Sequence, residues 1–156
     1  MSNPSAVQLQ FRAWDNEKKR FFRKDGYDES MVCVSTRGQI YLFDDEPYGS
    51  NTDRFILMQF TGYKDKYGNK VFANDIVLFH DPDIDDPDNL NQYWLVEQEL
   101  GGFWVDKSGL WDYSKDLSSK EWGYQLENLE VVGNLYEDAE LLSDHKIKGL
   151  KEKGIL

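Results

Sequence analysis

The chain has 156 residues, of which 40% are hydrophobic and 15% aromatic, and its formal net charge is −11. This length corresponds to one domain with a core of ordinary size. No apolar run approaches the roughly 18 residues of a membrane span, and the first residues lack the basic-then-apolar order of a signal peptide. We therefore expect a soluble cytoplasmic protein with no membrane partner.

The charge is unevenly distributed along the chain. Residues 1–24 carry a net +4 and residues 146–156 a net +3, whereas residues 25–145 carry −18. An acidic body repels phosphate backbones, so we do not expect nucleic acid as its partner. A basic arm near the N-terminus can dock on an acidic neighbour, such as a second copy of the chain, or can protect a strand edge. Its residues are Arg12, Lys18, Lys19, Arg20, Arg23 and Lys24.

The N-terminal region predicts a flexible tail followed by a hairpin. Residues 1–6 have no pattern, and we assign them to the tail. Residues 7–12 alternate apolar and polar side chains, as a half-buried strand does. Residues 15–18 can turn the chain, and Phe21-Phe22 can start a returning strand.

A second hairpin is predicted from two apolar runs, 31–35 and 39–43, which flank a glycine-containing loop. Cys33 lies in the first run and is the only cysteine, so the chain cannot form an intramolecular disulfide. Its apolar neighbours favour a buried, inert thiol over a nucleophile.

The central segment, residues 55–80, predicts a hairpin-like unit at the core of the fold. An apolar run over 55–60 breaks at Thr61-Gly62, a polar turn follows, and a second strand occupies 76–79. Asp75 is expected to fix the turn by accepting backbone N–H bonds, and Asn74 tolerates a positive φ. Gly62 and Gly68 are interpreted as turn requirements. We expect four side chains here to be buried: Phe55, Leu57, Ile76 and Val77.

An acidic loop follows over residues 81–91, with five carboxylates in its first nine residues. Asp81, Asp83 and Asp85 match the first ligand positions of an EF-hand, but Asp86 stands at the glycine position and Gln92 at the closing glutamate position. We therefore expect a solvated loop without a tight Ca²⁺ site.

The two histidines, His80 and His145, have no catalytic partner fixed by spacing. His80 precedes Asp81, and such a pair can form a general base. No serine or cysteine is tied to it by a motif, so a packing or solvation role is favoured.

A third hairpin is predicted for residues 93–99 and 103–107, around Gly101-Gly102. Residues 108–125 show no clear period. Aromatic side chains over 104–124 are either core or the lining of a groove for peptides or bases, and core packing is favoured. They are Trp104, Trp111, Tyr113, Trp122 and Tyr124.

The C-terminal part predicts a last strand over 129–136, with Gly133 at a bulge. A helix is expected over 137–153, because acidic residues lie early and lysines late. We assign residues 7–136 to one β-rich domain and residues 137–156 to a C-terminal helix and tail.

Three blocks of sequence resemble the YopX family, small proteins encoded by bacterial phages and prophages. The first is Phe11–Asp15 (FRAWD), and the second is Leu57–Gly68 with the step Asn74–Val77. The third is Val131–Glu137 with the nearby Glu140–Leu142. Asn74 replaces a commoner glycine. The resemblance implies an SH3-like β-barrel and a phage origin, and it supplies no catalytic residues.

The sequence thus predicts a mainly β fold: a small SH3-like β-barrel with additional hairpins and a C-terminal α-helix. No catalytic, cofactor-binding or metal-ligating residues are assigned, and no cofactor is expected. We interpret the chain as a non-enzymatic binding or assembly module. Its partner is another copy of itself, in a homo-oligomer, or a host or phage protein. The alternatives are an acidic DNA mimic that blocks a host nucleic-acid-binding protein and a metal-dependent enzyme that uses residues 81–89.

Overall fold

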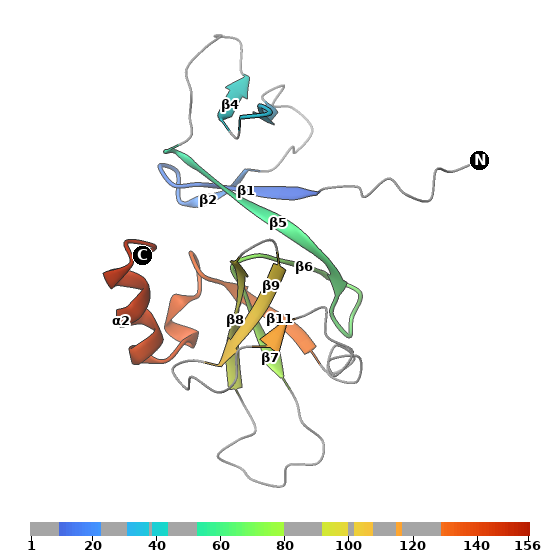
Figure 1. The fold of residues 1–156 in the computed structure, drawn as a ribbon, viewed down its shortest axis with the longest axis vertical. Helices are drawn as coiled ribbons and strands as arrows, with labels where there is room; N and C mark the ends of the chain where they lie inside the picture. The colour runs from blue at the N-terminus through green and yellow to red at the C-terminus, as the bar shows by residue number, and fades with distance from the viewer. Residues whose placement is uncertain are drawn as a thin grey trace, which may run out of the picture. The chain divides into compact units, whose positions relative to one another are not determined.

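A computed structural model gives the fold, which is mainly β and has one α-helix near its C-terminal end (Figure 1). The described residues contain eleven strands. The chain divides into two compact units, residues 1–59 and 60–156, and strand β5 (Phe55–Lys64) contributes to both. The assignment of residues 7–136 to one domain stays a prediction. The structure describes residues 10–22, 31–37, 39–43, 53–79, 92–99, 102–107, 115–116 and 129–156.

The first unit is built on strand β1 (Phe11–Asp15), which lies between two antiparallel neighbours. These neighbours are β2 (Arg20–Phe22) and the first half of β5. A separate hairpin joins β3 (Met31–Val34) to β4 (Ile40–Phe43), and its turn is closed by a 2.9 Å bond from the Ser35 N–H to the Gln39 carbonyl. Both hairpins predicted for this unit are therefore confirmed.

The burial of β1 differs from the predicted alternation. Phe11 is 47% exposed, whereas the three consecutive residues Ala13, Trp14 and Asp15 are buried. Both faces of the strand's end are covered: Ala13 packs in a cluster with Ile40 and Phe55, and the Trp14 ring meets the Phe21 ring edge-on. A central strand covered on two faces has no polar face.

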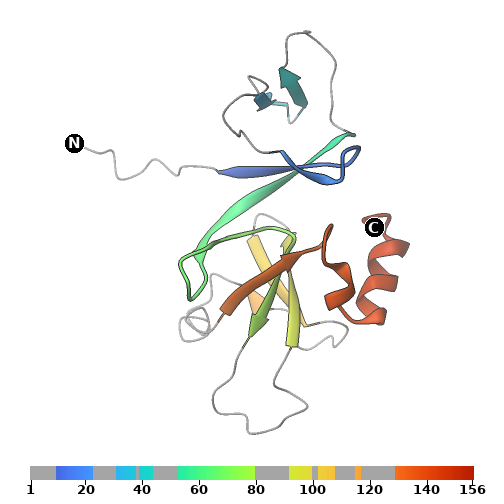
Figure 2. The same cartoon turned by 180° about the vertical axis from the view of Figure 1, so that it is seen from behind.

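The second unit contains a five-stranded antiparallel sheet in the order β10-β9-β8-β7-β11 (Figures 1 and 2). The predicted hairpin of residues 93–107 is present as β8 and β9, and β10 falls in the stretch that had no clear period. Gly133 lies at a register shift in β11, as predicted. The strands are β7 (Asp75–Phe79), β8 (Gln92–Glu99), β9 (Gly102–Lys107), β10 (Lys115–Asp116) and β11 (Leu129–Asn134).

A hairpin of β5 and β6 (Lys70–Phe72) closes against one edge of this sheet. The Lys66 N–H donates to the Leu129 carbonyl at 2.9 Å, and the Val131 N–H donates to the Asp65 carboxylate at 3.1 Å. The turn of the hairpin thus occupies the outer edge of β11, and the sheets curl into a half-barrel.

The central segment corrects one prediction, because β7 does not pair with β5. Strand β5 continues past Gly62, where a register shift and a φ of +90° absorb the break. Its partner in this region is the short strand β6. The turn at Ala73-Asn74, with Asn74 at a φ of +65°, then sends the chain into the five-stranded sheet.

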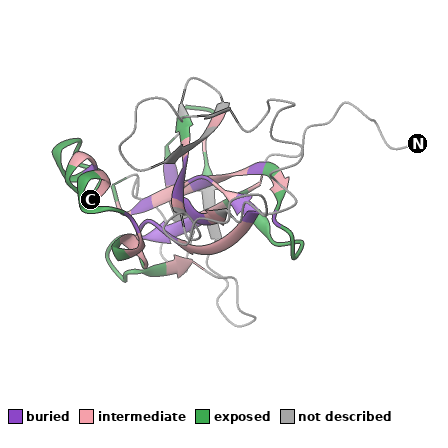
Figure 3. Cartoon of the chain, turned by 90° about the horizontal axis from the view of Figure 1, so that it is seen from below, coloured by how far each residue is buried: buried purple, intermediate pink, exposed green. Residues whose placement is uncertain are grey.

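Two buried clusters lie on the two faces of this sheet, because β7 and β8 send alternate side chains to each. Figure 3 colours the buried residues of the chain purple. Ile76 belongs to one cluster and Val77 to the other. The predicted burial of Phe55, Ile76 and Val77 is confirmed, whereas Leu57 is only half-buried. The first cluster is Val71, Val77, Trp94, Val96 and Leu129, and the second is Ile76, Leu95, Leu135, Leu142 and Leu150.

The C-terminal helix begins later than predicted. A 3₁₀ turn (Ala139–Leu141) comes first, and helix α2 (Asp144–Glu152) begins after the extended residue Leu142. The Ser143 hydroxyl accepts a bond from the Lys146 N–H at 3.3 Å and so fixes the helix start. Gly154 follows the helix in a left-handed conformation, as expected for a helix end. Within the described part of the chain, no helix has the length and apolar character needed to cross a membrane.

Candidate functional site

Asp65 is the centre of the turn between β5 and β6. Its side chain is buried, and one carboxylate oxygen accepts the N–H groups of Tyr67 and Asn69 at 2.9 and 2.8 Å. The other oxygen accepts the Asn69 amide at 3.0 Å and the Val131 N–H at 3.1 Å. Burial opposes ionisation, but these four hydrogen bonds outweigh it and lower the pKa of Asp65. The carboxylate is thus ionised and engaged in holding the turn against β11.

Asp75 and Asn134 hold two further turns of the second unit. Asp75 is fully buried and accepts the Phe72 N–H at 2.8 Å, so its predicted turn-fixing role is confirmed. The Asn134 side-chain carbonyl accepts the N–H groups of Tyr136 and Glu137 at 3.0 and 3.2 Å. Sequence reasoning did not single out Asn134, although Asn before a turn is a known signal.

Gly133 has a steric role beside Asn134. A Cβ atom at this position would lie 2.5 Å from the Asp138 carboxylate, which accepts the Asn134 N–H at 3.0 Å. Only glycine fits there without moving the turn.

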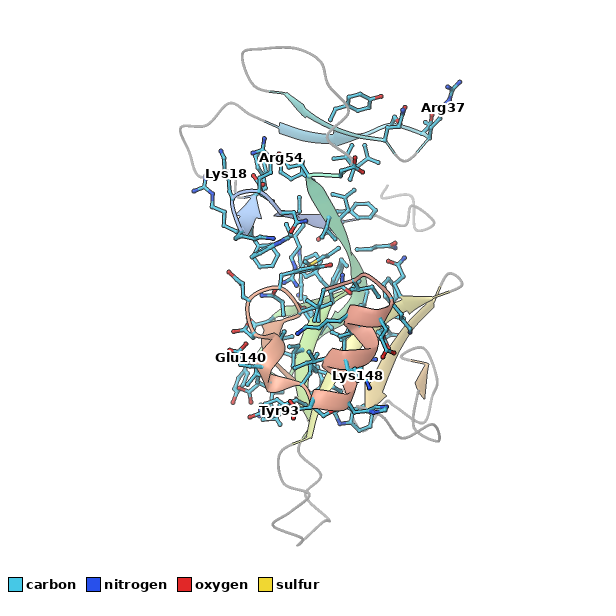
Figure 4. The ribbon with its side chains drawn as sticks, turned by 90° about the vertical axis from the view of Figure 1, so that its left-hand side faces the viewer. Lys18, Arg37, Arg54, Tyr93, Glu140 and Lys148 are labelled. Atoms are coloured by element: carbon cyan, nitrogen blue, oxygen red, sulfur yellow. The ribbon has the colours of Figure 1, made fainter. Side chains whose placement is uncertain are left out.

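Asp15 holds the turn of the first unit with help from a cation. Its carboxylate accepts the N–H groups of Glu17 and Lys18, both at 3.0 Å. It also pairs with two nitrogen atoms of the Arg54 guanidinium, at 3.1 Å from Nε and 2.7 Å from Nη2. Arg54 is labelled in Figure 4. The hydrogen bond from Arg54 is the largest cause that lowers the pKa of Asp15 to about 2. No sequence signal joins two residues that are 39 positions apart, and Arg54 was missed.

Four residues of the predicted basic arm are described, and Arg12 differs from the other three in its surroundings. The Arg12 guanidinium lies 4.7 Å from the centre of the Phe21 ring, and its Nε lies 3.2 Å from the Met58 sulfur, so this residue packs along the sheet. Lys18, Lys19 and Arg20 are exposed at the β1–β2 turn. Arg23 and Lys24 lie outside the described residues.

Several other candidates also fall outside the described residues. These are the tail 1–6, His80, the acidic loop 81–91 and four of the aromatic residues, Trp111, Tyr113, Trp122 and Tyr124. Cys33 lies on β3 and Trp104 on β9, while His145 is exposed on α2. Across the described ranges, no group of three or more His, Cys, Asp or Glu side chains is placed to hold a metal ion.

The β5–β6 hairpin presents cations and an aromatic ring to solvent. Lys64 and Lys70 lie directly opposite each other, and both are exposed. Tyr67 is 67% exposed at the turn, and the Lys66 ammonium lies 4.9 Å from the centre of its ring. Lys66 also pairs with Glu130 at 2.8 Å, which raises the pKa of Lys66. The sequence showed these residues only as part of a polar turn.

Comparisons with known proteins agree on one relationship. The sequence profile of the YopX protein family matches residues 10–143. The fold is similar to that of protein EF1440 from Enterococcus faecalis, with 21% identity and a TM-score of 0.54, covering 88% of this chain and 100% of that one. It is also similar to protein yopX from Bacillus subtilis, with 18% identity and a TM-score of 0.51, covering 85% and 97%. A search of curated proteins finds no match.

Proposed function

The chain belongs to the YopX family, and from this premise we propose that it is a non-enzymatic binding or assembly module, encoded by a phage or prophage and active in the host cytoplasm. The observation that carries the proposal is that the buried aspartates in the blocks that resemble the YopX family hold turns. Asp15, Asp65 and Asp75 are buried, and each accepts at least one backbone N–H group. Groups engaged in this way hold turns and are not offered to a substrate.

The framework of this module is proposed to be an SH3-like barrel with additional hairpins. Three features support it: the curled five-stranded sheet, the closure of the β5–β6 turn on the edge of β11, and the helix that packs through Leu150 on the same sheet. Such a framework carries binding residues on loops and hairpin turns, where variation does not disturb the core.

The partner is proposed to be another copy of the chain. An acidic chain that displays lysines on an exposed hairpin is complementary to itself, and complementary charges steer subunits together. Multi-angle light scattering at micromolar concentration tests this directly. We expect a mass above that of the monomer, and a monomer mass at both low and physiological salt would contradict self-assembly.

The alternative is an acidic DNA mimic, and one observation favours it. Residues 60–156 contain 20 acidic and 10 basic residues, so the negative charge is concentrated in the second unit. A mimic competes with DNA for the same protein site. The test is competition: a host nucleic-acid-binding protein is loaded on labelled duplex DNA and titrated with the chain. Release of the DNA supports mimicry, and an unchanged complex contradicts it for that protein.

A further inference from the structure

The outer face of the β5–β6 hairpin combines cations with aromatic rings. Val71 points inward and is 1% exposed, so its neighbours Lys70 and Phe72 point to the opposite face. The registers place Lys64 opposite Lys70 and Phe60 opposite Phe72, and directly opposed residues share a face. The two phenylalanine rings lie 5.6 Å apart, and the Lys70 ammonium lies 5.6 Å from the Phe60 ring.

The opposed lysines place two positive charges side by side on one exposed face of the hairpin. Like charges directly opposite each other destabilise a strand pair. Lys66 adds a third cation at the turn, although Glu130 pairs with it. The hairpin is therefore a basic site in a unit that carries twice as many acidic as basic residues.

Helix α2 also displays lysines, but their charge is balanced along the helix. Lys148 has Asp144 four residues before it and Glu152 four residues after it, and such spacing places opposite charges side by side. Lys146 is engaged with Glu97 at 2.9 Å. The remaining helix lysines are exposed like those of the hairpin, but they have acidic neighbours and no directly opposed cation. They therefore serve as a control for the hairpin lysines.

Tyr67 gives the hairpin a rigid contact residue. This residue is 67% exposed, yet its backbone N–H donates to the Asp65 carboxylate, and the Gly68 N–H donates to the Asp65 carbonyl at 2.9 Å. An exposed aromatic side chain on a fixed turn loses little conformational entropy when it binds, which is typical of an interface anchor.

We propose that the hairpin surface formed by Lys64, Lys66, Tyr67 and Lys70 binds the aspartate-rich segment, residues 81–88, of a second copy of this chain. The inference rests on the proposed self-assembly and names its contact. The segment holds five aspartates and no basic residue in eight positions. A long phosphate polymer would extend past the hairpin onto an acidic chain, whereas a short acidic segment needs only the local charge.

The first test measures the contact with a probe peptide. A fluorescent peptide of residues 81–91, DPDIDDPDNLN, is titrated with the full chain by anisotropy, beside a peptide in which every Asp is replaced by Asn. We expect binding of the acidic peptide only, weakened by salt. Lys64→Gln with Lys70→Gln should reduce affinity about tenfold. Tyr67→Ala should also reduce it, and circular dichroism confirms that both variants are folded.

The matched control is Lys148→Gln with Lys151→Gln on α2, which removes the same charge and should change affinity by less than about twofold. Equal losses in the two double variants would show a net-charge effect and overturn the proposal. A labelled single-stranded oligonucleotide is titrated in parallel. If it binds the hairpin more tightly than the acidic peptide does, the assignment of the occupant is wrong.

The second test uses self-association of the full chain, measured by light scattering. We expect the hairpin double variant to shift the mass toward the monomer and the helix double variant to leave it unchanged. A wild-type oligomer that both variants leave intact would overturn the hairpin contact while the proposed self-assembly stands. A monomeric wild-type chain would overturn both.

Discussion

In each unit a buried aspartate holds a turn, but the two aspartates have different hydrogen-bond partners. Asp15 is the last residue of β1 and accepts two backbone N–H groups, and the Arg54 guanidinium supplies the rest of its partners. Asp65 follows a strand, and its four hydrogen bonds come from backbone and amide N–H groups. Both carboxylates have a lowered pKa, so both turns lose stability as the pH falls, but only the first turn loses an ion pair when its carboxylate is protonated.

The two units also differ in the size of their buried clusters. Among the described residues, the cluster of the first unit contains three buried residues, Ala13, Ile40 and Phe55, whereas the two clusters of the second unit contain ten. Apolar burial is the dominant source of stability. We therefore expect the second unit to be held mainly by packing, and the first to depend more on its ion pair.

The largest expected effect tests the difference in packing. Ile76 is 0% exposed in the second unit, and Ile76→Ala should reduce the free energy of unfolding by about 4 kcal/mol. The matched change Ile40→Ala, at a 6% exposed residue of the first unit, should cost about 2 kcal/mol. Amide hydrogen exchange reports each unit separately. Equal losses would show that the two cores are equally tight, and an unchanged midpoint for Ile76→Ala would show that it is not a core residue.

The next largest effect concerns Asp65 and the neutral N–H donors that it binds. Asp65→Ala leaves four N–H groups without their acceptor, so we expect a loss of about 3 kcal/mol in urea denaturation. Glu140→Ala, at an exposed residue of the same unit, is the control and should change little. A loss below about 1 kcal/mol would mean that water replaces the carboxylate at little cost.

A pH titration tests the ion pair between Asp15 and Arg54. Because the pKa of Asp15 is lowered to about 2, its stabilising effect is present above its ordinary pKa and is lost as the pH falls from about 4 to 2. The shift corresponds to about 2 kcal/mol. Arg54→Gln should remove most of this effect, so that the variant is less stable at pH 7 but approaches the wild type at pH 2.

The control for this titration is Arg20→Gln, which removes a charge from an exposed residue of the same unit. Its stability should follow the wild-type pH profile. If Arg54→Gln and wild type differ by the same amount at pH 7 and pH 2, the ion pair is not the source of the pH dependence.

The smallest expected effect concerns an ion pair in the second unit. Lys66 pairs with Glu130, but both side chains are partly exposed, at 25% and 29%. Such pairs contribute little, and Lys66→Gln should cost less than about 1 kcal/mol in thermal unfolding. A larger loss would mean that an ion pair also stabilises the second unit, which we interpret as held by packing and neutral hydrogen bonds.

Local patterns were sufficient to predict most strands and turns. The hairpins around residues 36–38 and 101–102, the bulge at Gly133 and the role of Asp75 follow from alternation and turn chemistry within a few residues. The partner of β5 was predicted wrongly, because the choice between β6 and β7 depends on which sheet each strand joins. Periodicity does not carry that information.

Contacts between distant parts of the chain could not be predicted. Arg54 reaches Asp15 across 39 positions, and Val131 reaches Asp65 across 66. The start of α2 was missed for a local reason: the charge order of residues 137–153 suits a helix, but Ser143 caps a shorter one. The hairpin surface was missed because Lys64 and Lys70 become neighbours only through their register.

The bond between Asp65 and Val131 also bears on how the chain folds. The β5–β6 turn closes over a few residues and can form quickly, whereas β11 must arrive from 66 positions away. We expect this closure to form after the transition state. Asp65→Ala removes the early local turn bonds together with the late bond to Val131, so it should slow refolding and also accelerate unfolding, which stopped-flow kinetics can measure. The late hydrogen bonds that hold the hairpin to the sheet would thus set the lifetime of the folded chain rather than the speed at which it forms.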